Sequence, residues 1–321
     1  MRKTCLAAGA ALLATVFAAS TPRIAVTQPV GPAESSQTAI RDGKIEFSGV
    51  RYHYVMAIGH GEPIVLLHGW GETSHMWRYV MPALVARGHT VLAPDIRGLG
   101  DTARPATGYE KANVARDIHE LVSVLGLGPR IIVAGHDIGG MIAYAYAAQY
   151  RDQVSRLVVM DVPLPGINTW KDISASPRAW HFRFFNVPDV PEMLIAGHER
   201  EFIRWFRNVE AINTSALTPE SEDYYATSYA QPGALRGGFE YYRAFAQDEI
   251  DNGAFAKRPL KMPVLGLGAS GGLGNTMGVL LRNVASDVKT VVITNSGHWI
   301  AEEQPQQVIA ALADFIPAPS N

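Results

Sequence analysis

The stretch that decides the fold is Arg130-Ile-Ile-Val-Ala-Gly-His-Asp-Ile-Gly-Gly140, an apolar run that leads directly into a glycine-flanked acid. Residues 130–134 predict a buried strand, since Ile131 to Ala134 are all apolar, and residues 138–149 predict a helix that follows at once. Gly135 and Gly139 stand two residues before and after Asp137, which is typical of a tight strand-to-helix turn that raises one side chain above the sheet. An aspartate at such a turn can also be an ordinary helix N-cap. The buried strand before it favours Asp137 as an exposed nucleophile.

Buried strands alternate with helices on both sides of this stretch. Strands are predicted at residues 44–47, 52–58, 63–67, 90–94, 157–160, 263–267 and 288–294, and further helices at 109–125 and 305–315. This alternation predicts an α/β fold with a mostly parallel central sheet and helices on both faces.

A helical insertion interrupts the alternation between residues 164 and 257. Strand-like runs are nearly absent there, aromatic residues are frequent, and residues 199–208 are strongly amphipathic. We expect a helical cap over the carboxyl ends of the strands, which is where open α/β sheets bind ligands. The predicted organisation is therefore a core at 42–163 and 258–321, with the cap at 164–257.

The N-terminal residues have the layout of a secretory signal peptide. A basic start at 1–3 precedes an apolar run at 4–19 and small residues at 18–20. We expect a signal peptide at 1–20, a flexible leader at 21–41, and a periplasmic or secreted protein without a membrane anchor after processing; an uncleaved anchor is the alternative. Cys5 is the only cysteine, so the processed chain would have no disulfide or thiol nucleophile.

The composition excludes several classes of partner and cofactor. With 28 basic and 30 acidic side chains, the net charge of −2 gives no reason to expect a nucleic-acid partner. The histidines show no spacing typical of a metal site, and the glycines around 98–100 do not form a dinucleotide fingerprint. We therefore expect neither a metal nor another cofactor.

Four further residues complete a catalytic arrangement around Asp137. His298 follows the last predicted strand, and this order of nucleophile and distant histidine is typical of a base. The loop at 268–274, where the acid that holds such a histidine usually lies, contains no carboxylate, so Asp161 after the preceding strand is assigned that role. The alternative is that Asp161 only ends its strand before Pro163. The backbone N–H groups of Trp70 and Ile138 are predicted to form an oxyanion hole.

An aspartate nucleophile restricts the reaction. A carboxylate is ionised at neutral pH and attacks a saturated carbon to give an alkyl ester, which suits epoxides and alkyl halides. A halide needs Trp or Asn N–H donors, and the residue after Asp137 is Ile138 rather than Trp. The cap segments 180–182 and 239–243 supply His181 and two tyrosine hydroxyls, which suit an opening epoxide. They also supply Trp180 and Tyr241, which we expect to contact an apolar substrate.

Several motifs resemble those of the α/β-hydrolase epoxide hydrolases, in particular the secreted Cif-like bacterial subgroup. They are H-G-W-G at 68–71, A-P-D at 93–95, G-L-G at 98–100, G-H-D-I-G at 135–139, W-H-F at 180–182, L-I-A-G at 194–197, F-E-Y-Y-R at 239–243 and G-H-W at 297–299. The resemblance implies a covalent Asp137 ester, a vicinal diol product, and His181 with Tyr242 as the ring-opening pair. It also implies a role in virulence, and it leaves a homodimer as an open expectation. Asp161 stands where the subgroup has Glu, so its reach to His298 is a question for the structure.

Two other functions remain open from the sequence. One is a haloalkane dehalogenase on the same scaffold. The other is a non-catalytic protein that binds a ligand or a host partner with a hydrolase fold; the presence of Asp137, His298 and Tyr242 together argues against it, because a binding protein does not need all three.

Overall fold

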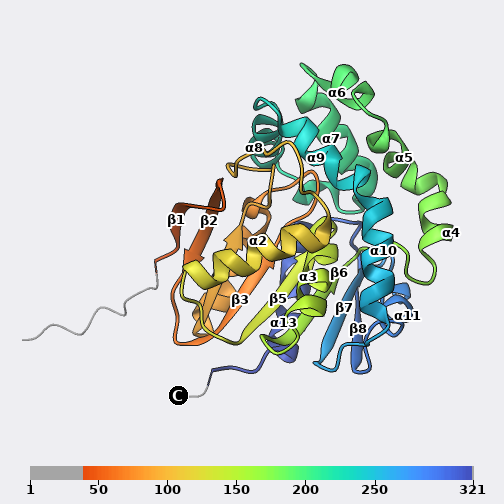
Figure 1. Cartoon of the computed structure of the whole chain (residues 1–321). Coiled ribbons are helices and arrows are strands. Elements are labelled where there is room, and N and C mark those ends of the chain that lie inside the picture. Colours follow the sequence, from red (N-terminus) through yellow and green to blue (C-terminus); the bar gives the residue numbers. More distant parts are fainter. Residues whose placement is uncertain (1–38, 320–321) are drawn as a thin grey trace, which may run out of the picture. The chain divides into compact units, whose positions relative to one another are not determined.

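One eight-stranded sheet organises residues 39–319, the part of the chain that the computed structural model describes (Figure 1). Its strands are β1 (Arg41–Phe47), β2 (Val50–Ala57), β3 (Gly61–Leu67), β4 (His89–Pro94), β5 (Ile131–His136), β6 (Val154–Met160), β7 (Val264–Ala269) and β8 (Val288–Ile293). The order is β1-β2-β4-β3-β5-β6-β7-β8. The pairs β1–β2 and β2–β4 are antiparallel and every other pair is parallel, which confirms the predicted fold class. The predicted signal peptide lies outside the described residues.

Helices cover both faces of the sheet. They are α1 (Met81–Ala86), α2 (Lys111–Val124), α3 (Ile138–Gln149), α10 (Phe245–Ala256), α11 (Thr276–Leu281), α12 (Ile300–Glu303) and α13 (Pro305–Phe315), with a short 3₁₀ turn at Ser74–Arg78. In Figure 1, α2, α3 and α10 lie in front of the sheet and α13 lies behind it. Strands β4, β5 and β7 are buried along their whole length, as expected for parallel strands covered on both sides.

The cap is made of helices between β6 and β7. They are α4 (Trp170–Ala175), α5 (Trp180–Asn186), α6 (Val190–Ile195), α7 (Glu199–Glu210), α8 (Pro219–Tyr229) and α9 (Ala234–Arg243), with 3₁₀ turns at Pro177–Ala179 and Thr214–Ala216. The cap ends earlier than expected: α10 lies within the predicted range 164–257 but packs on α2 and α3, where Asp248 pairs with Lys111 (Figure 1). A helical period alone does not distinguish a cap helix from one that returns to the sheet.

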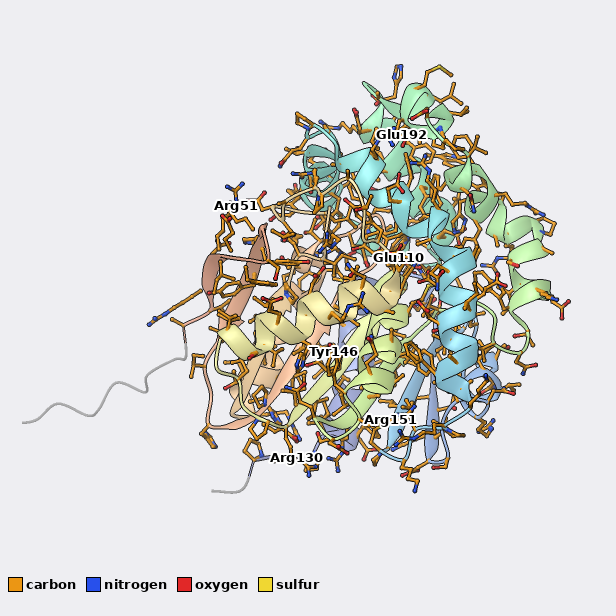
Figure 2. All side chains as sticks on the ribbon, viewed as in Figure 1. Arg51, Glu110, Arg130, Tyr146, Arg151 and Glu192 are labelled. Atoms are coloured by element: carbon orange, nitrogen blue, oxygen red, sulfur yellow. The ribbon has the colours of Figure 1, made fainter. Side chains whose placement is uncertain are left out.

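The surface carries charges of both signs. Figure 2 shows Arg51 and Arg130 at the periphery, and both side chains are exposed. Among the helices described here, none is long and apolar enough to cross a membrane.

The parallel register brings the ends of β5 and β6 side by side. His136 pairs with Met160, so the residues that follow, Asp137 and Asp161, leave the sheet at the same edge. Their backbones continue the ladder: the N–H of Asp137 donates to the carbonyl of Met160, and that of Asp161 to the carbonyl of Leu267. The cap lies over this edge (Figure 1).

Candidate active site

The turn between β5 and α3 holds Asp137 in a strained conformation. Its φ of +50° lies in a region that non-glycine residues rarely adopt. The turn closes because its flanking residues are small: a Cβ on Gly135 would collide with the carbonyl of Gly139, and one on Gly139 with the carbonyl of Leu67 in β3. The predicted elbow is therefore present, and the two glycines are required by close backbone contacts.

The carboxylate of Asp137 has a hydrogen bond on one oxygen and a cation partner on the other. Oδ1 accepts from the backbone N–H of Trp70 at 2.8 Å, and Oδ2 lies 3.6 Å from Nε2 of His298. Burial alone would raise the pKa of Asp137, but His298, the charge of His136 and the Trp70 N–H together lower it to about 2. The side chain is thus ionised at neutral pH without any other base. Ile138, the second predicted oxyanion donor, is the first residue of α3.

Asp161 reaches His298. Its Oδ2 lies 3.0 Å from Nδ1 of the imidazole. Its Oδ1 accepts the backbone N–H groups of Ala269 and Leu273, each at 2.9 Å. The loop after β7, which has no carboxylate of its own, therefore binds the carboxylate that comes from β6. The side chain lies against Gly272, where a Cβ would collide with Oδ2.

His298 is a partly buried imidazole between two carboxylates. Burial would lower its pKa, but Asp137 and Asp161 outweigh that effect and raise the pKa well above the ordinary value. In the free protein His298 is therefore an imidazolium with a carboxylate at each ring nitrogen. Any reaction that neutralises Asp137 removes one of these two negative charges.

A buried polar network lies behind His298 and was not found from the sequence. His136 Nε2 donates to the carbonyl of His298 at 2.8 Å, and its Nδ1 lies 2.9 Å from Oε2 of Glu72. Glu72 Oε1 lies 3.8 Å from Arg207 of α7, which also pairs with Glu302. All these charged side chains are buried. The residues come from four separate segments, so no local pattern could have joined them.

The cap also holds the backbone of the His298 loop. The N–H of His298 donates to the carbonyl of Glu210, the last residue of α7, at 2.8 Å. A side chain on Gly297 would collide with the same carbonyl. The glycine before the histidine therefore lets the loop approach the cap helix closely.

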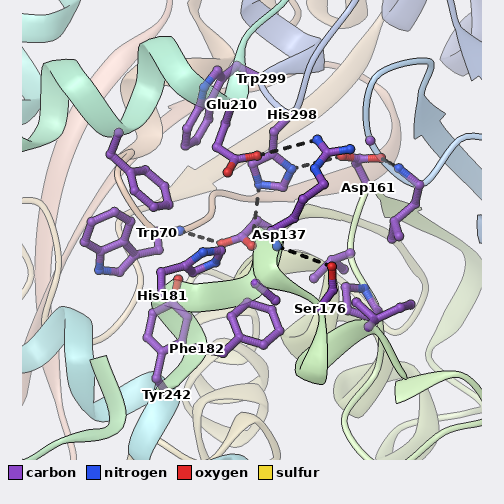
Figure 3. A pocket seen from close by; sticks show the side chains of 18 residues that line it. Trp70, Asp137, Asp161, Ser176, His181, Phe182, Glu210, Tyr242, His298 and Trp299 are labelled. Atoms are coloured by element: carbon purple, nitrogen blue, oxygen red, sulfur yellow. Dashed lines mark hydrogen bonds and ion pairs between the residues drawn. The ribbon is translucent and has the colours of Figure 1, made fainter. Parts of the chain in front are cut away.

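A cavity of about 230 Å³ opens above Asp137, between core and cap (Figure 3). It is lined by Trp70, Asp137, Asp161, Val162, Pro163, Ile173, Ser176, Arg178, Ala179, His181, Phe182, Phe206, Glu210, Tyr242, Gly272, Leu273, His298 and Trp299. The cap thus places His181 and Tyr242, the pair that the resemblance suggested, in the same cavity as Asp137. Their ring centroids lie 5.9 Å apart.

Both cap residues are neutral proton donors at neutral pH. Burial lowers the pKa of His181 to about 4, against the opposing charge of Asp137. Burial and the charge of Asp137 raise the pKa of Tyr242 well above that of a free phenol. One imidazole N–H and one phenol O–H can therefore be offered to an oxygen in the cavity.

The two expected substrate contacts are placed differently. Tyr241 is buried away from the cavity, and its hydroxyl donates to the carbonyl of Arg97 at 2.8 Å. Trp180 is not among the lining residues either; its ring packs against Trp205 and Phe184. Successive residues of a helix point about 100° apart, so only one residue of each aromatic pair faces the cavity. The structure therefore corrects the prediction for Trp180 and Tyr241.

Two charged residues at the cavity were missed. Arg178 donates to the carbonyl of Gly271 at 2.8 Å, which joins the cap to the loop after β7, and lies 3.9 Å from Glu210. Neither belongs to a recognisable motif. Within residues 39–319 no group of three acidic, histidine or cysteine side chains is arranged to hold a metal ion.

Comparisons with known proteins agree with this geometry. The pattern of the alpha/beta hydrolase fold matches residues 62–305. The soluble epoxide hydrolase of Corynebacterium sp. (strain C12) is 38% identical over 287 residues, which cover 87% of this chain and 99% of that protein. Crystal structures of Cfl2 from Burkholderia cenocepacia (38% identity, TM-score 0.83, 88% of this chain and 98% of that one) and of the Cif epoxide hydrolase from Acinetobacter nosocomialis (27%, 0.78, 89% and 91%) are also similar. The chain therefore belongs to the α/β-hydrolase fold family, and within it to the epoxide hydrolases.

Proposed function

We propose that this protein hydrolyses an apolar epoxide to a vicinal diol through an ester on Asp137. The observation that carries the proposal is the cavity itself, which is lined by an ionised aspartate from the core and by a neutral imidazole and a phenol from the cap. A strained ring needs a nucleophile at carbon and a proton donor at oxygen, and the cavity offers both.

Ring opening is the first step. A carboxylate oxygen of Asp137 attacks an epoxide carbon and the C–O bond breaks. The released ring oxygen, hydrogen-bonded by His181 and Tyr242, takes the phenol proton of Tyr242, which becomes a tyrosinate. Because the phenol and the imidazole are both neutral, neither repels the positive charge of His298, and each keeps a hydrogen to donate. The product of this step is an alkyl ester of Asp137.

Ester hydrolysis is the second step. Esterification removes the charge of Asp137, so His298 retains only Asp161 as a carboxylate partner and gives up its extra proton, which restores the phenol of Tyr242. The neutral imidazole then takes a proton from water, and the resulting hydroxide attacks the Asp137 carbonyl carbon. The N–H of Trp70, already 2.8 Å from Oδ1, stabilises the oxyanion, and the diol leaves with the proton from His298. The new carboxyl group of Asp137 then protonates His298 and restores the starting ion pair.

The geometry disfavours a halide-binding site. Of the two tryptophans that line the cavity, Trp299 donates its indole N–H to the carbonyl of Arg207 at 2.8 Å. The indole nitrogen of Trp70 is buried against α9, 2.8 Å from where a Cβ on Gly238 would lie. Neither indole N–H of these two residues is therefore directed at a leaving halide, and the epoxide hypothesis is favoured over the dehalogenase hypothesis.

Covalent trapping tests the mechanism. His298→Gln should still undergo alkylation by a terminal epoxide such as 1,2-epoxyhexane but should not hydrolyse the ester. Intact-mass and peptide mass spectrometry should show a gain of one substrate mass on the peptide that contains Asp137. Asp137→Asn is the matched control and should gain no mass.

Isotope labelling provides an independent check. A single turnover of the unmodified protein in H₂¹⁸O should place the label in the Asp137 carboxylate and leave the new diol oxygen unlabelled. Label that enters the diol directly in the first turnover would show that water, rather than Asp137, attacks the ring.

Export is the second part of the proposal. The basic start and apolar run at residues 1–20 support a secreted or periplasmic protein. N-terminal sequencing of protein from the periplasm or the medium should give a mature chain that begins near residue 21; a full-length chain retained in the cytoplasm would contradict this.

A further inference from the structure

A second cavity lies directly beside the catalytic one. It has a volume of about 660 Å³ and lies between α4, α5 and the start of α10. Phe182 lines both cavities, and it is the one residue that the two sets of lining residues share. The ring of Phe182 therefore stands in the wall that separates the space above Asp137 from this second space.

The ring of Phe182 is held by other aromatic rings. Its centroid lies 5.6 Å from that of Trp170, 5.2 Å from that of Phe245 and 5.8 Å from that of Tyr242. Trp170 and Phe245 belong to the second cavity and Tyr242 to the catalytic one. These contacts keep the wall closed, since a packed aromatic ring moves only if its neighbours do.

The lining of the second cavity is apolar next to Phe182 and more polar farther from it. Trp170, Phe182 and Phe245 form its apolar inner part, whereas Arg183, Asn186 and Glu249 contribute polar groups. An alkyl chain that passed the position of Phe182 would meet an apolar surface first. The space behind the wall is thus suited to extend a hydrocarbon substituent.

We propose that Phe182 determines specificity by setting the longest unbranched apolar substituent that the catalytic cavity accepts. This inference rests on the proposed epoxide hydrolase function. The ring ends the catalytic cavity on the side of α4 and α10, so a chain that is too long meets Phe182 before its epoxide carbon reaches Asp137. The second cavity is the space into which a longer chain would extend if this ring were smaller.

Chain-length profiles test the proposal. kcat/KM is measured for a homologous series of linear terminal epoxides, and each variant is described by the ratio of its values for a long and a short member. Each methylene that enters an apolar site contributes about 0.8 kcal/mol, or about fourfold in kcat/KM. For Phe182→Ala we expect the optimum to move by two or more methylenes and the ratio to rise by about tenfold or more. Phe182→Leu, a milder truncation, should change it in the same direction.

Two further variants distinguish a specific effect of the Phe182 ring on chain length from a general loosening of the cap. Phe184→Ala removes a ring from the same helix that lines neither cavity, and it should keep the unmodified profile. Ala246→Phe fills the second cavity from α10, and in the Phe182→Ala background it should return the optimum to its original length. An unchanged profile in Phe182→Ala, an equal change in Phe184→Ala, or no reversal by Ala246→Phe would each overturn the proposal.

Binding measurements keep this result distinct from the proposed chemistry. Dissociation constants of unreactive linear alkyl amides, measured by calorimetry, should show the same shift in preferred length between the unmodified protein and Phe182→Ala. If the protein turned over no epoxide but the shift in preferred amide length remained, the proposed reaction would be refuted and the role of Phe182 supported. If short epoxides were turned over but the preferred length did not shift, the proposed reaction would be supported and the role of Phe182 refuted.

Discussion

Asp137 and His298 face each other across 3.6 Å between Oδ2 and Nε2, an anion and a cation that are each other's charge partner in the free protein. The His298 cation keeps Asp137 ionised, the form that a nucleophile needs. The Asp137 carboxylate in turn keeps a proton on His298, so the imidazole cannot act as a base. In the proposed mechanism, alkylation of Asp137 ends both effects at once, so this one contact would set the order of the two chemical steps.

Asp137→Asn should lower the pKa of His298. Removal of one of two adjacent carboxylates leaves only Asp161 to favour the imidazolium, so the pKa of His298 should fall. NMR titration of histidine-labelled protein measures this, with His298→Gln used to assign the signal. Asp42→Asn, which removes a carboxylate that contacts His53 instead, should leave the His298 titration unchanged. A His298 signal that titrates at the same pH in Asp137→Asn would refute the coupling.

Gly272→Ala should slow ester hydrolysis more than ring opening. The new Cβ would collide with Oδ2 of Asp161, the oxygen that contacts His298, so the imidazole would lose its orientation. We expect kcat to fall by about 10–100-fold, because a misplacement of about 1 Å can cost roughly 100-fold in rate. Rapid-quench kinetics should show a burst of esterified protein before slow turnover. Gly253→Ala is the matched control, because its Cβ would enter open space. Parallel losses in both steps would contradict this prediction.

Arg207→Met should destabilise the protein strongly. Arg207 is fully buried and pairs with Glu302 and Glu72, so its removal leaves two buried carboxylates without their shared cation. The free energy of unfolding should fall by about 3–5 kcal/mol, as measured by urea denaturation. Arg204→Met, on the same helix with an exposed side chain paired to Glu222, should cost at most about 1 kcal/mol. Similar losses in the free energy of unfolding for the two variants would show that the buried ion cluster contributes no more to stability than an exposed ion pair.

His53 should make stability depend on pH in the alkaline range. Burial lowers its pKa, but Asp95 at 2.7 Å and Asp42 at 2.8 Å outweigh burial and raise it to about 9. Since the unfolded value is about 6.5, the stabilisation is fully present below pH 6.5 and is lost as the pH rises through 9. We expect a loss of about 1–3 kcal/mol from this group. Thermal unfolding between pH 6 and 10 should show it, and His53→Gln should give a flatter curve; equal slopes would exclude the effect.

Most of the core was predictable because its signals are local. Residues 131–134 are apolar on both faces of the strand, which indicates a buried strand, and Gly135 and Gly139 mark the turn that the structure contains. The assignment of Asp161 depended on the absence of a carboxylate at 268–274, and the structure shows why that loop lacks one: it supplies N–H donors and a glycine instead.

The cap was predictable only in outline. Tyr241 and Tyr242 are adjacent in the sequence, yet one faces Arg97 and the other the cavity, because the orientation of α9 depends on its packing rather than on local pattern. The same limit applied to Trp180 beside His181 and to α10. The walls of the cavity, including Phe182 and Arg178, come from elements whose positions no single segment specifies.

The ion cluster around Arg207 has a consequence for attempts to recombine cap and core between relatives. The guanidinium belongs to the cap, whereas the carboxylates that neutralise it belong to the loop after β3 and to α12. A chimaera that grafts a foreign cap lacking this arginine would leave Glu72 with only His136, and Glu302 with only Arg78, as charged partners beneath the new helices. Exchange of the whole cap therefore requires Glu72, Glu302 and His136 to be changed together with it.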